Sequence, residues 1–205
     1  MARTTPRKSG PERREEIARA ALQIMGARGS SGLTMAALAE AVGLTSGALF
    51  RHFANRDAIL EAAVELAVSE VEATFPAAEL PAIERLGHLA RARIALLSKE
   101  PAVAWLLRSG QAVGTLPPPA VKRLGGLVQR SRAYIRDALR GAVAAGDVRT
   151  DVSPDVLLLI FTSTVHALIG RPGSPGRTTR GVPPDRAVDE LLVLLASAPT
   201  TNGRS

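Results

Sequence analysis

The chain has 205 residues, of which 46% are hydrophobic, 22% charged and 3% aromatic, and its formal net charge is +7. These proportions are those of an ordinary globular protein and exclude collagen-like, disulfide-scaffold and wholly disordered chains. Because the chain has no cysteine, disulfides, thiolate nucleophiles, iron–sulfur clusters and cysteine-based zinc sites are excluded too. The positive charge favours a polyanionic partner, either nucleic acid or an anionic membrane surface, and is equally compatible with solubility alone.

Apolar residues recur at helical spacing through most of the chain, as Ile17, Ala21 and Ile24 do in the first such segment. No segment alternates for long with the period of two that marks strands. Prolines stand at the start of several of the segments, where the first turn of a helix tolerates them. The sequence therefore predicts an all-α protein of about nine helices, at 11–28, 34–42, 45–52, 55–75, 81–98, 101–111, 119–145, 154–169 and 184–196.

No export signal or membrane span is expected. The basic residues of 1–10 are not followed by an apolar stretch of signal-peptide length. The most apolar segments, 156–170 and 191–198, are shorter than the roughly 20 residues that cross a bilayer. We therefore expect a cytoplasmic protein with a flexible arm at 1–10 and a disordered tail at 199–205.

The most informative stretch is residues 33–57, LTMAALAEAVGLTSGALFRHFANRD. Thr34 and Thr45 each stand where a helix N-cap is needed, and leucines flank each of them as in a hydrophobic staple. Gly43 stands where a left-handed residue ends the first of the two helices, and the small Ala39 lets the helices approach closely. Two short helices joined by a tight turn form a helix-turn-helix, which places its second helix in the DNA major groove.

The first turn of that second helix has only small side chains, those of Thr45, Ser46, Gly47 and Ala48. Small residues let the backbone approach the groove and meet base edges or phosphates. Because no long side chain reads bases there, we expect Arg51, the N-terminal arm and DNA shape to add specificity.

The residues that follow are predicted to support and extend this surface. Phe53 is expected to pack inward, and His52 to donate to a phosphate. Asn55 is expected to cap the next helix, whose free N–H groups at Arg56 and Asp57 form a site for another phosphate.

At these residues the chain resembles the TetR family of bacterial transcriptional regulators. The match consists of Thr34 and residues 43–53 and 55–57, at the family's spacing, and it extends over about residues 11–70. The resemblance implies contacts to the DNA backbone by Thr34, Thr45, the Phe50 position, His52 and Arg56, and base contacts by residues 46–48 and Arg51. The family usually has a tyrosine at the position of Phe50, so the missing hydroxyl implies weaker backbone affinity.

The resemblance also implies the domain organisation. An N-terminal three-helix helix-turn-helix DNA-binding domain is expected at 11–70, with the motif at about 34–53. An all-helical ligand-binding and dimerisation domain is expected at 71–198.

In this family the last two helices of each subunit form a four-helix bundle with those of its partner. The near-continuous apolar segments at 154–169 and 184–196 suit a homodimer of this kind. Charged residues at Leu158 and Leu194 are therefore expected to give monomers.

A ligand pocket combines apolar walls with a few polar groups. The candidates for a pocket in the second domain are Trp105, Gln111, Tyr134, Phe161, His166 and His88. Each of these is more often ordinary core or surface than a ligand contact.

Three further segments keep alternative interpretations. The arm at 1–10 either contacts DNA or is simply disordered. The loop at 170–184, rich in glycine and proline, is either a mobile surface connection or a functional loop. The basic face of the helix at 119–145 is either a solvated surface or a site for an anionic effector or nucleic acid.

No catalytic arrangement is evident. The three histidines are far apart and lack metal-ligand spacing, and neither a nucleophile elbow nor a phosphate loop is present. We therefore predict that the chain is not an enzyme and holds no metal or cofactor.

Together these features predict a homodimeric transcriptional regulator, with repression as the favoured activity, which binds a palindromic double-stranded operator. A small apolar or amphipathic effector is expected to release it. The alternatives are a helical ligand-binding protein whose DNA motif is vestigial, and an architectural or activating protein without effector-controlled repression.

Overall fold

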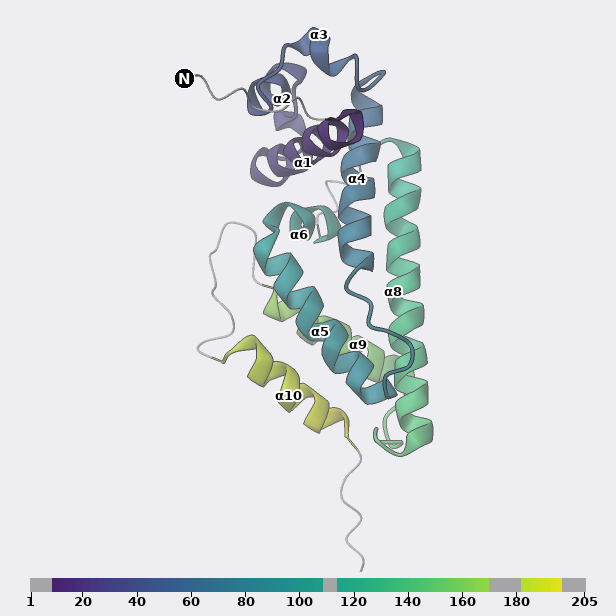
Figure 1. Ribbon diagram of the computed structural model, residues 1–205. Coiled ribbons are helices and arrows are strands. Elements are labelled where there is room, and N and C mark those ends of the chain that lie inside the picture. The colour runs from purple at the N-terminus through teal and green to yellow at the C-terminus, as the bar shows by residue number, and fades with distance from the viewer. Residues whose placement is uncertain (1–8, 109–113, 170–181, 197–205) are drawn as a thin grey trace, which may run out of the picture. The chain divides into compact units, whose positions relative to one another are not determined.

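The computed structural model describes residues 9–108, 114–169 and 182–196 (Figure 1). Within these ranges the chain is all-α, as the sequence predicts, and has no strand. The elements are α1 (Gly10–Arg28), the 3-10 helix η1 (Ser30–Gly32), α2 (Met35–Ala41), α3 (Ser46–Leu49), α4 (Arg56–Glu72), α5 (Ala82–Lys99), α6 (Pro101–Arg108), α8 (Pro118–Ala145), α9 (Pro154–Leu168) and α10 (Pro184–Leu195). The predictions for the tail at 199–205 and for Gln111 fall outside the described residues, as do those for most of the arm at 1–10 and of the loop at 170–184.

Two helices are predicted too long, the one at 55–75, which spans Arg56–Glu72 in the structure, and the one at 45–52, which spans Ser46–Leu49. Regular α-helix ends at Leu49, because the amides of Arg51 and His52 donate to carbonyls three residues back and not four. Such i to i−3 bonds tighten the chain into a 3-10-like turn. The recognition element is therefore a single helical turn followed by a compact bend.

The described residues form two compact units. The first contains α1, η1, α2, α3, most of α4, α6 and the beginning of α8, and the second contains the end of α4, α5, the rest of α8, α9 and α10. The first part of unit 1 ends at Glu70, and unit 1 also includes residues 100–126.

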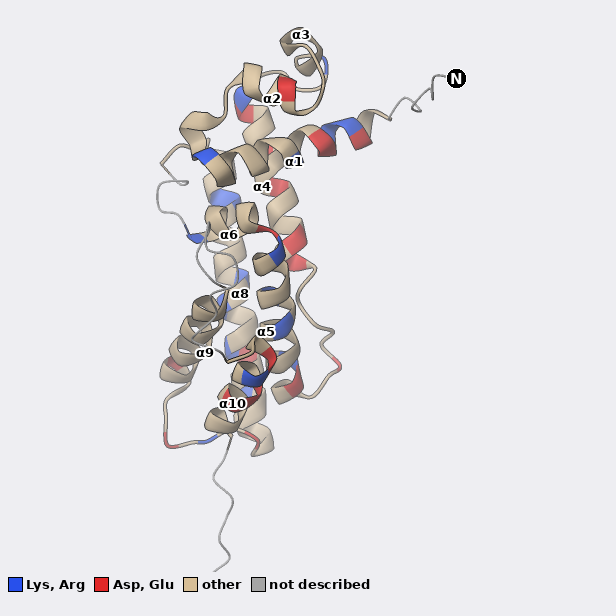
Figure 2. Cartoon of the chain, turned by 90° about the vertical axis from the view of Figure 1, so that its left-hand side faces the viewer, with Lys and Arg blue, Asp and Glu red and all other residues tan. Residues whose placement is uncertain are grey.

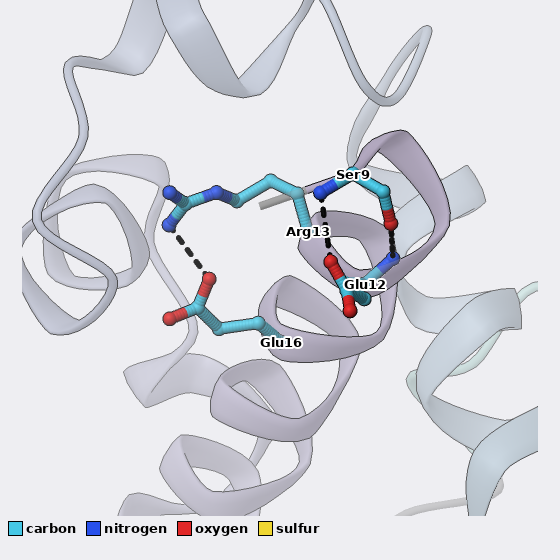
Figure 3. Close-up of polar contacts among 4 residues, drawn as sticks. All are labelled: Ser9, Glu12, Arg13 and Glu16. Atoms are coloured by element: carbon cyan, nitrogen blue, oxygen red, sulfur yellow. Dashed lines mark hydrogen bonds and ion pairs between the residues drawn. The ribbon is translucent and has the colours of Figure 1, made fainter. Parts of the chain in front are cut away.

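Helix α1 begins with a reciprocal cap (Figure 3). The amide of Glu12 donates to the Ser9 hydroxyl, and the amide of Ser9 donates to the Glu12 carboxylate at 2.8 Å. One turn later Arg13 pairs with Glu16 at 2.6 Å. A capping box of this kind satisfies two of the amides that the first turn of a helix leaves open.

Unit 1 has a continuous apolar core. Its largest fully buried side chains are those of Ile17, Met25, Leu38, Leu49, Phe53, Ile59, Leu60 and Leu106. Helices α1 and α6 approach so closely that a Cβ added at Gly26 would lie 2.6 Å from the Cα of Ala102. The absence of a side chain at Gly26 thus permits the packing of α6 on α1.

In unit 2, helix α5 contacts both α9 and α10 (Figure 1). Arg91 of α5 forms an ion pair with Asp189 of α10. Phe161 of α9 is fully buried, together with Leu86, Leu127 and Leu139.

Half of the basic residues of α8 form ion pairs with acids of neighbouring segments. Arg123 pairs with Glu65 and Arg130 with Glu72, both in α4, and Arg136 pairs with Asp155 at the beginning of α9. Half of the six basic residues on this helix therefore hold helices together, and Lys122, Arg132 and Arg140 are at least partly exposed.

None of the described helices is both long and apolar enough to cross a membrane. Among the same residues, no three side chains of the metal-binding types gather into one cluster.

Candidate nucleic-acid interface

The turn between α2 and α3 is fixed by backbone bonds that require a glycine. Gly43 has a φ of 64°, in the left-handed region that favours this residue. Its amide donates to the Glu40 carbonyl at 3.2 Å, and the Leu44 amide donates to the Ala39 carbonyl at 2.9 Å. This pair of bonds is a Schellman motif, which ends a helix and redirects the chain. The local sequence thus sets the angle at which α3 leaves α2.

Both threonine caps that the sequence predicts are present. The Thr34 hydroxyl accepts from the amide of Ala37 at 3.1 Å, and the Thr45 hydroxyl accepts from the amide of Ala48 at 3.2 Å. The predicted cap of α4 is confirmed as well, since the Asn55 side chain accepts from the amide of Ala58 at 2.8 Å. Each helix of the motif therefore begins at a residue that the sequence identifies.

Phe53 anchors the end of the motif. As predicted, it packs inward and is 2% exposed. The Arg14 guanidinium of α1 lies 4.2 Å from the centroid of the Phe53 ring and donates to the His52 carbonyl. A cation stacked on an aromatic face and bonded to a backbone carbonyl holds the bend after α3 against α1.

Arg56 faces the other end of the motif. Its guanidinium donates to the carbonyls of Leu33 and Ser30, at 3.5 and 3.3 Å. Leu33 and Ser30 lie just before α2, and Leu33 is next to the Thr34 cap. The two bonds of Arg56 therefore fix the start of α2. The sequence predicts a phosphate contact for this side chain, and in the structure it is half-buried and bonded to the protein.

The outer surface of the motif has mostly small side chains and few charges. Thr34, Thr45, Ser46, Gly47 and Arg51 are exposed, and His52 is half-buried. The only charged residue within α2 and α3 is an acid, in α2, so these helices are mostly tan in Figure 2. A surface of this kind admits close backbone approach to a groove, with base-edge contacts made by few side chains.

Two residues of the predicted surface have particular environments. Ala48 is 7% exposed and belongs to the core side of α3, which argues against a base contact by its methyl group. Phe50 is 50% exposed, an unusual position for a large apolar side chain. Its exposure marks a place where a partner would cover apolar surface.

Gly47 is free of packing constraints within the described chain. A Cβ built on it meets no other atom within 4 Å, and its φ is not positive. Neither the fold of the motif nor its backbone conformation requires a glycine at this position. A glycine at this position is therefore explained by close approach of a binding partner to α3.

The predicted pocket residues are divided between the two units and the part of the chain outside the described residues. Tyr134 and Phe161 lie in unit 2, whereas Trp105 belongs to α6 of unit 1. His166 and His88 are exposed, and Gln111 is outside the described residues.

Sequence reasoning missed the residues that pack around Tyr134. The ring of Phe75 lies 4.9 Å from that of Tyr134, and the Tyr134 hydroxyl donates to the Pro76 carbonyl at 3.1 Å. Arg85 and Arg93 lie 5.9 Å from the Tyr134 ring and 5.4 Å from the Phe75 ring, respectively. The sequence signal for this cluster is weak, because Arg85 and Arg93 stand among the other polar residues of α5.

Comparison with known proteins agrees with this geometry. Residues 17–63 match the family model of bacterial regulatory proteins of the tetR family. This match runs from within α1 to the middle of α4 and contains the whole helix-turn-helix.

A similar curated protein is a nucleoid occlusion factor, SlmA, of Marinobacter nauticus. It is 29% identical over 150 residues, which are 70% of this chain and 73% of that protein. Two solved structures share the fold. One is AibR in complex with isovaleryl coenzyme A and operator DNA, with a TM-score of 0.72, 20% identity and coverage of 90% of this chain and 98% of that one. The other is PfmR of Thermus thermophilus, a TetR-family regulator, with a TM-score of 0.67, 22% identity and coverage of 89% and 99%.

The residues that form the motif, its caps and its turn all lie inside the segment that matches the family model. The all-helical chain beyond that segment has the fold of regulators of the same family. Residues 17–63 therefore carry the DNA-binding domain of the tetR family of bacterial regulatory proteins, and the chain as a whole has the fold of AibR and PfmR.

Proposed function

We propose that this regulator is a repressor that binds a palindromic operator as a homodimer and is released by a small effector. The observation that carries the DNA-binding part is the pair of capped helices with an exposed, unconstrained Gly47 at the outer face of α3. In this arrangement the first turn of α3 enters the major groove. Ser46, Gly47 and Arg51 face the bases, and Thr34, Thr45 and His52 contact the DNA backbone.

Arg56 and Phe50 take supporting parts in this proposal. Because its guanidinium is bonded to two carbonyls, Arg56 orients the Thr34 cap toward a phosphate. Phe50 covers the sugar edge with its exposed ring and supplies no hydrogen bond. The protein's affinity for the DNA backbone thus depends mainly on hydroxyl donors and on His52.

The test is selection of bound duplexes from a random pool, followed by affinity measurements over a range of salt concentrations. The recovered sequences are expected to be palindromic, with log affinity falling linearly with log salt. Arg51→Ala is expected to change the preferred sequence, and His52→Ala to weaken all duplexes about equally. Arg132→Ala, which removes an exposed charge of α8, serves as the control and should change neither.

The reverse pattern would contradict the proposed docking. A preference altered by His52→Ala but not by Arg51→Ala would mean that another surface reads the bases. Absence of any duplex preference at low salt would mean that the motif is vestigial.

A homodimer is supported by the apolar surface of the last two helices. Large side chains of α9 and α10 remain exposed, namely Val156 (45%), Leu159 (63%), Ile160 (41%), Val193 (73%) and Leu194 (68%). A monomer seldom exposes so many large apolar side chains on two adjacent helices. Both helices are those that the sequence predicts for the intersubunit bundle.

The structure corrects one choice of interface residue. Leu158 is 8% exposed and packs within its own chain, so a charge there would damage the fold, whereas Leu194 is suited to the test. Leu194→Glu is expected to give monomers in sedimentation velocity. Val128→Glu changes an exposed apolar residue of α8 and should leave the dimer intact. Equal dimer content in both variants would overturn the assignment.

Effector control requires that DNA and effector favour different states of the dimer. AibR, whose fold this chain shares, has been crystallised with isovaleryl coenzyme A and operator DNA together. We place the effector of this chain in unit 2, beside Tyr134, where Phe75 and Arg85 also lie. The nucleoid occlusion factor among the relatives favours the alternative of a DNA-binding architectural protein without effector control.

Measuring release of the operator distinguishes an effector-controlled repressor from an architectural DNA-binding protein. A repressor is expected to lose its operator when a cell extract or compound library supplies the effector, and an architectural protein is expected to keep it.

A further inference from the structure

Two helices of unit 2 bury hydrogen-bond donors that have no partner. Nη2 of Arg93 and Nε of Arg85, both in α5, and Oγ of Ser131 in α8 are sealed from solvent and make no hydrogen bond. Buried polar groups are nearly always satisfied in folded proteins, so each exception needs an explanation. Arg85 is partly explained, because its Nη1 faces Asp137 at 3.5 Å. The charged group that remains without an explanation among these three is Arg93.

Arg93 is held rigidly but has no counter-charge. Its Nε donates to the Thr74 hydroxyl at 2.9 Å, and its guanidinium lies over the Phe75 ring. None of the ion pairs among the described residues involves it. Arg91, two residues earlier on the same helix, pairs with Asp189 and Asp185 on the surface.

Burial lowers the pKa of Arg93 to about 10, which leaves the guanidinium charged at neutral pH. An unpaired charge away from water is costly, and a fold retains one when something else compensates it. The missing component is therefore an anion.

The surroundings of Arg93 are aromatic and apolar. The rings of Phe75 and Tyr134 pack with centroids 4.9 Å apart, and the guanidinium of Arg93 lies on the Phe75 side of this pair. Ile94 and Leu97 of the same helix are buried. A ligand group bound by Arg93 would therefore be followed by an apolar body.

We propose that Arg93 binds the carboxylate of a small amphipathic ligand in unit 2. A carboxylate offers two oxygens in the plane that suits the open edge of a guanidinium. A phosphate dianion needs more donors than this one side chain provides.

The regulatory consequence rests on the proposed function. Helix α5, which carries Arg93, packs on α9 and α10, the helices proposed to form the dimer. The ion pair of Arg91 with Asp189 links α5 to α10 directly. When a carboxylate binds Arg93, α5 shifts. Because α5 packs on the dimer helices α9 and α10, they shift as well, and the spacing of the two recognition helices in the dimer changes.

The experiment measures thermal stabilisation of the full chain by four carboxylate probes, formate, acetate, benzoate and octanoate, at constant ionic strength with chloride as reference. Wild type, Arg93→Met and Arg91→Met are compared. At least one carboxylate is expected to raise the melting temperature of wild type saturably. Arg93→Met should lose this response or weaken it roughly 10- to 100-fold, as loss of a charged hydrogen bond does, and Arg91→Met should keep it. 1-Octanol, which lacks the anionic group, should act equally on all three.

The stability of the ligand-free variants gives a second measure. Because Arg93→Met removes an uncompensated charge, it is expected to melt at or above the temperature of wild type. If Arg93→Met does not fold, Arg93→Gln replaces it in both measurements.

Equal responses of wild type and the Arg93 variant to all four anions would overturn the proposal, and so would a large loss of stability in the ligand-free variant. The outcome does not depend on DNA. Operator affinity measured in the same samples therefore separates a failure of the carboxylate site from a failure of the proposed function.

Discussion

Replacing Gly47 with alanine separates the requirements of DNA binding from those of the fold. The added methyl group meets no atom of the described chain within 4 Å, and the backbone at Gly47 does not have a positive φ. Alanine should therefore fit without strain and stabilise the protein by about 0.5 kcal/mol through its higher helix propensity. If Gly47 has a structural purpose, the same change should instead reduce stability.

The effect on DNA affinity should have the opposite sign. In the proposed docking, the methyl group enters the space between α3 and the floor of the groove. Forcing one extra methyl group into a packed contact costs about 1–3 kcal/mol, and each dimer presents two recognition helices. Because about 1.4 kcal/mol is a tenfold change in affinity, we expect the operator to bind about 10- to 100-fold more weakly, even if the contact relaxes partly.

Thermal unfolding followed by circular dichroism measures the first effect, and fluorescence anisotropy with a selected duplex measures the second. Gly125→Ala is the matched control, because an added Cβ at that position of α8 also meets nothing within 4 Å. It should stabilise the protein without changing the affinity for DNA. Unchanged operator affinity in Gly47→Ala would refute the docking, and a lower melting temperature would refute the argument that the fold does not need this glycine.

Three further changes test the framework behind α3. Gly26→Ala should lower the free energy of unfolding by about 1–3 kcal/mol, because the new Cβ would lie 2.6 Å from the Cα of Ala102; greater stability in urea denaturation would contradict this. Thr34→Ala removes the N-cap of α2 and should cost about 1 kcal/mol, with faster amide exchange in α2; unchanged exchange would mean that the cap is dispensable. Arg14→Met should weaken all duplexes equally by loosening the bend that ends at His52; an altered sequence preference would show that Arg14 reads bases.

The helix-turn-helix could be predicted because its determinants are local. A cap acts on amides two or three residues away, and a left-handed glycine acts on its own φ, so Thr34, Gly43 and Thr45 carry the signal in the sequence itself. The bounds of the longer helices follow for the same reason. The length of α3 was less predictable, because the change to i−3 bonding after Leu49 accompanies the burial of Phe53 against α1.

The support of the motif was not predictable. Arg14 and His52 are 38 residues apart in the chain, and Arg56 reaches carbonyls 23 and 26 residues away. From the sequence, an arginine near a DNA-binding motif is predicted to contact phosphate. Only the fold shows which backbone carbonyls it can reach instead. The inward position of Ala48 is likewise a matter of which side of a short helix meets the core.

Charge shows the same division between sequence and tertiary structure. The sequence alone determined an all-α chain, a capped helix-turn-helix and a net charge of +7. Only the tertiary structure showed that Arg123, Arg130 and Arg136 of α8 are paired with acids, whereas Arg93 is half-buried with no acid of the described chain paired to it. Composition counts charges, but what a charge does depends on the few ångströms around it, and those distances are set by segments that are far apart in the chain.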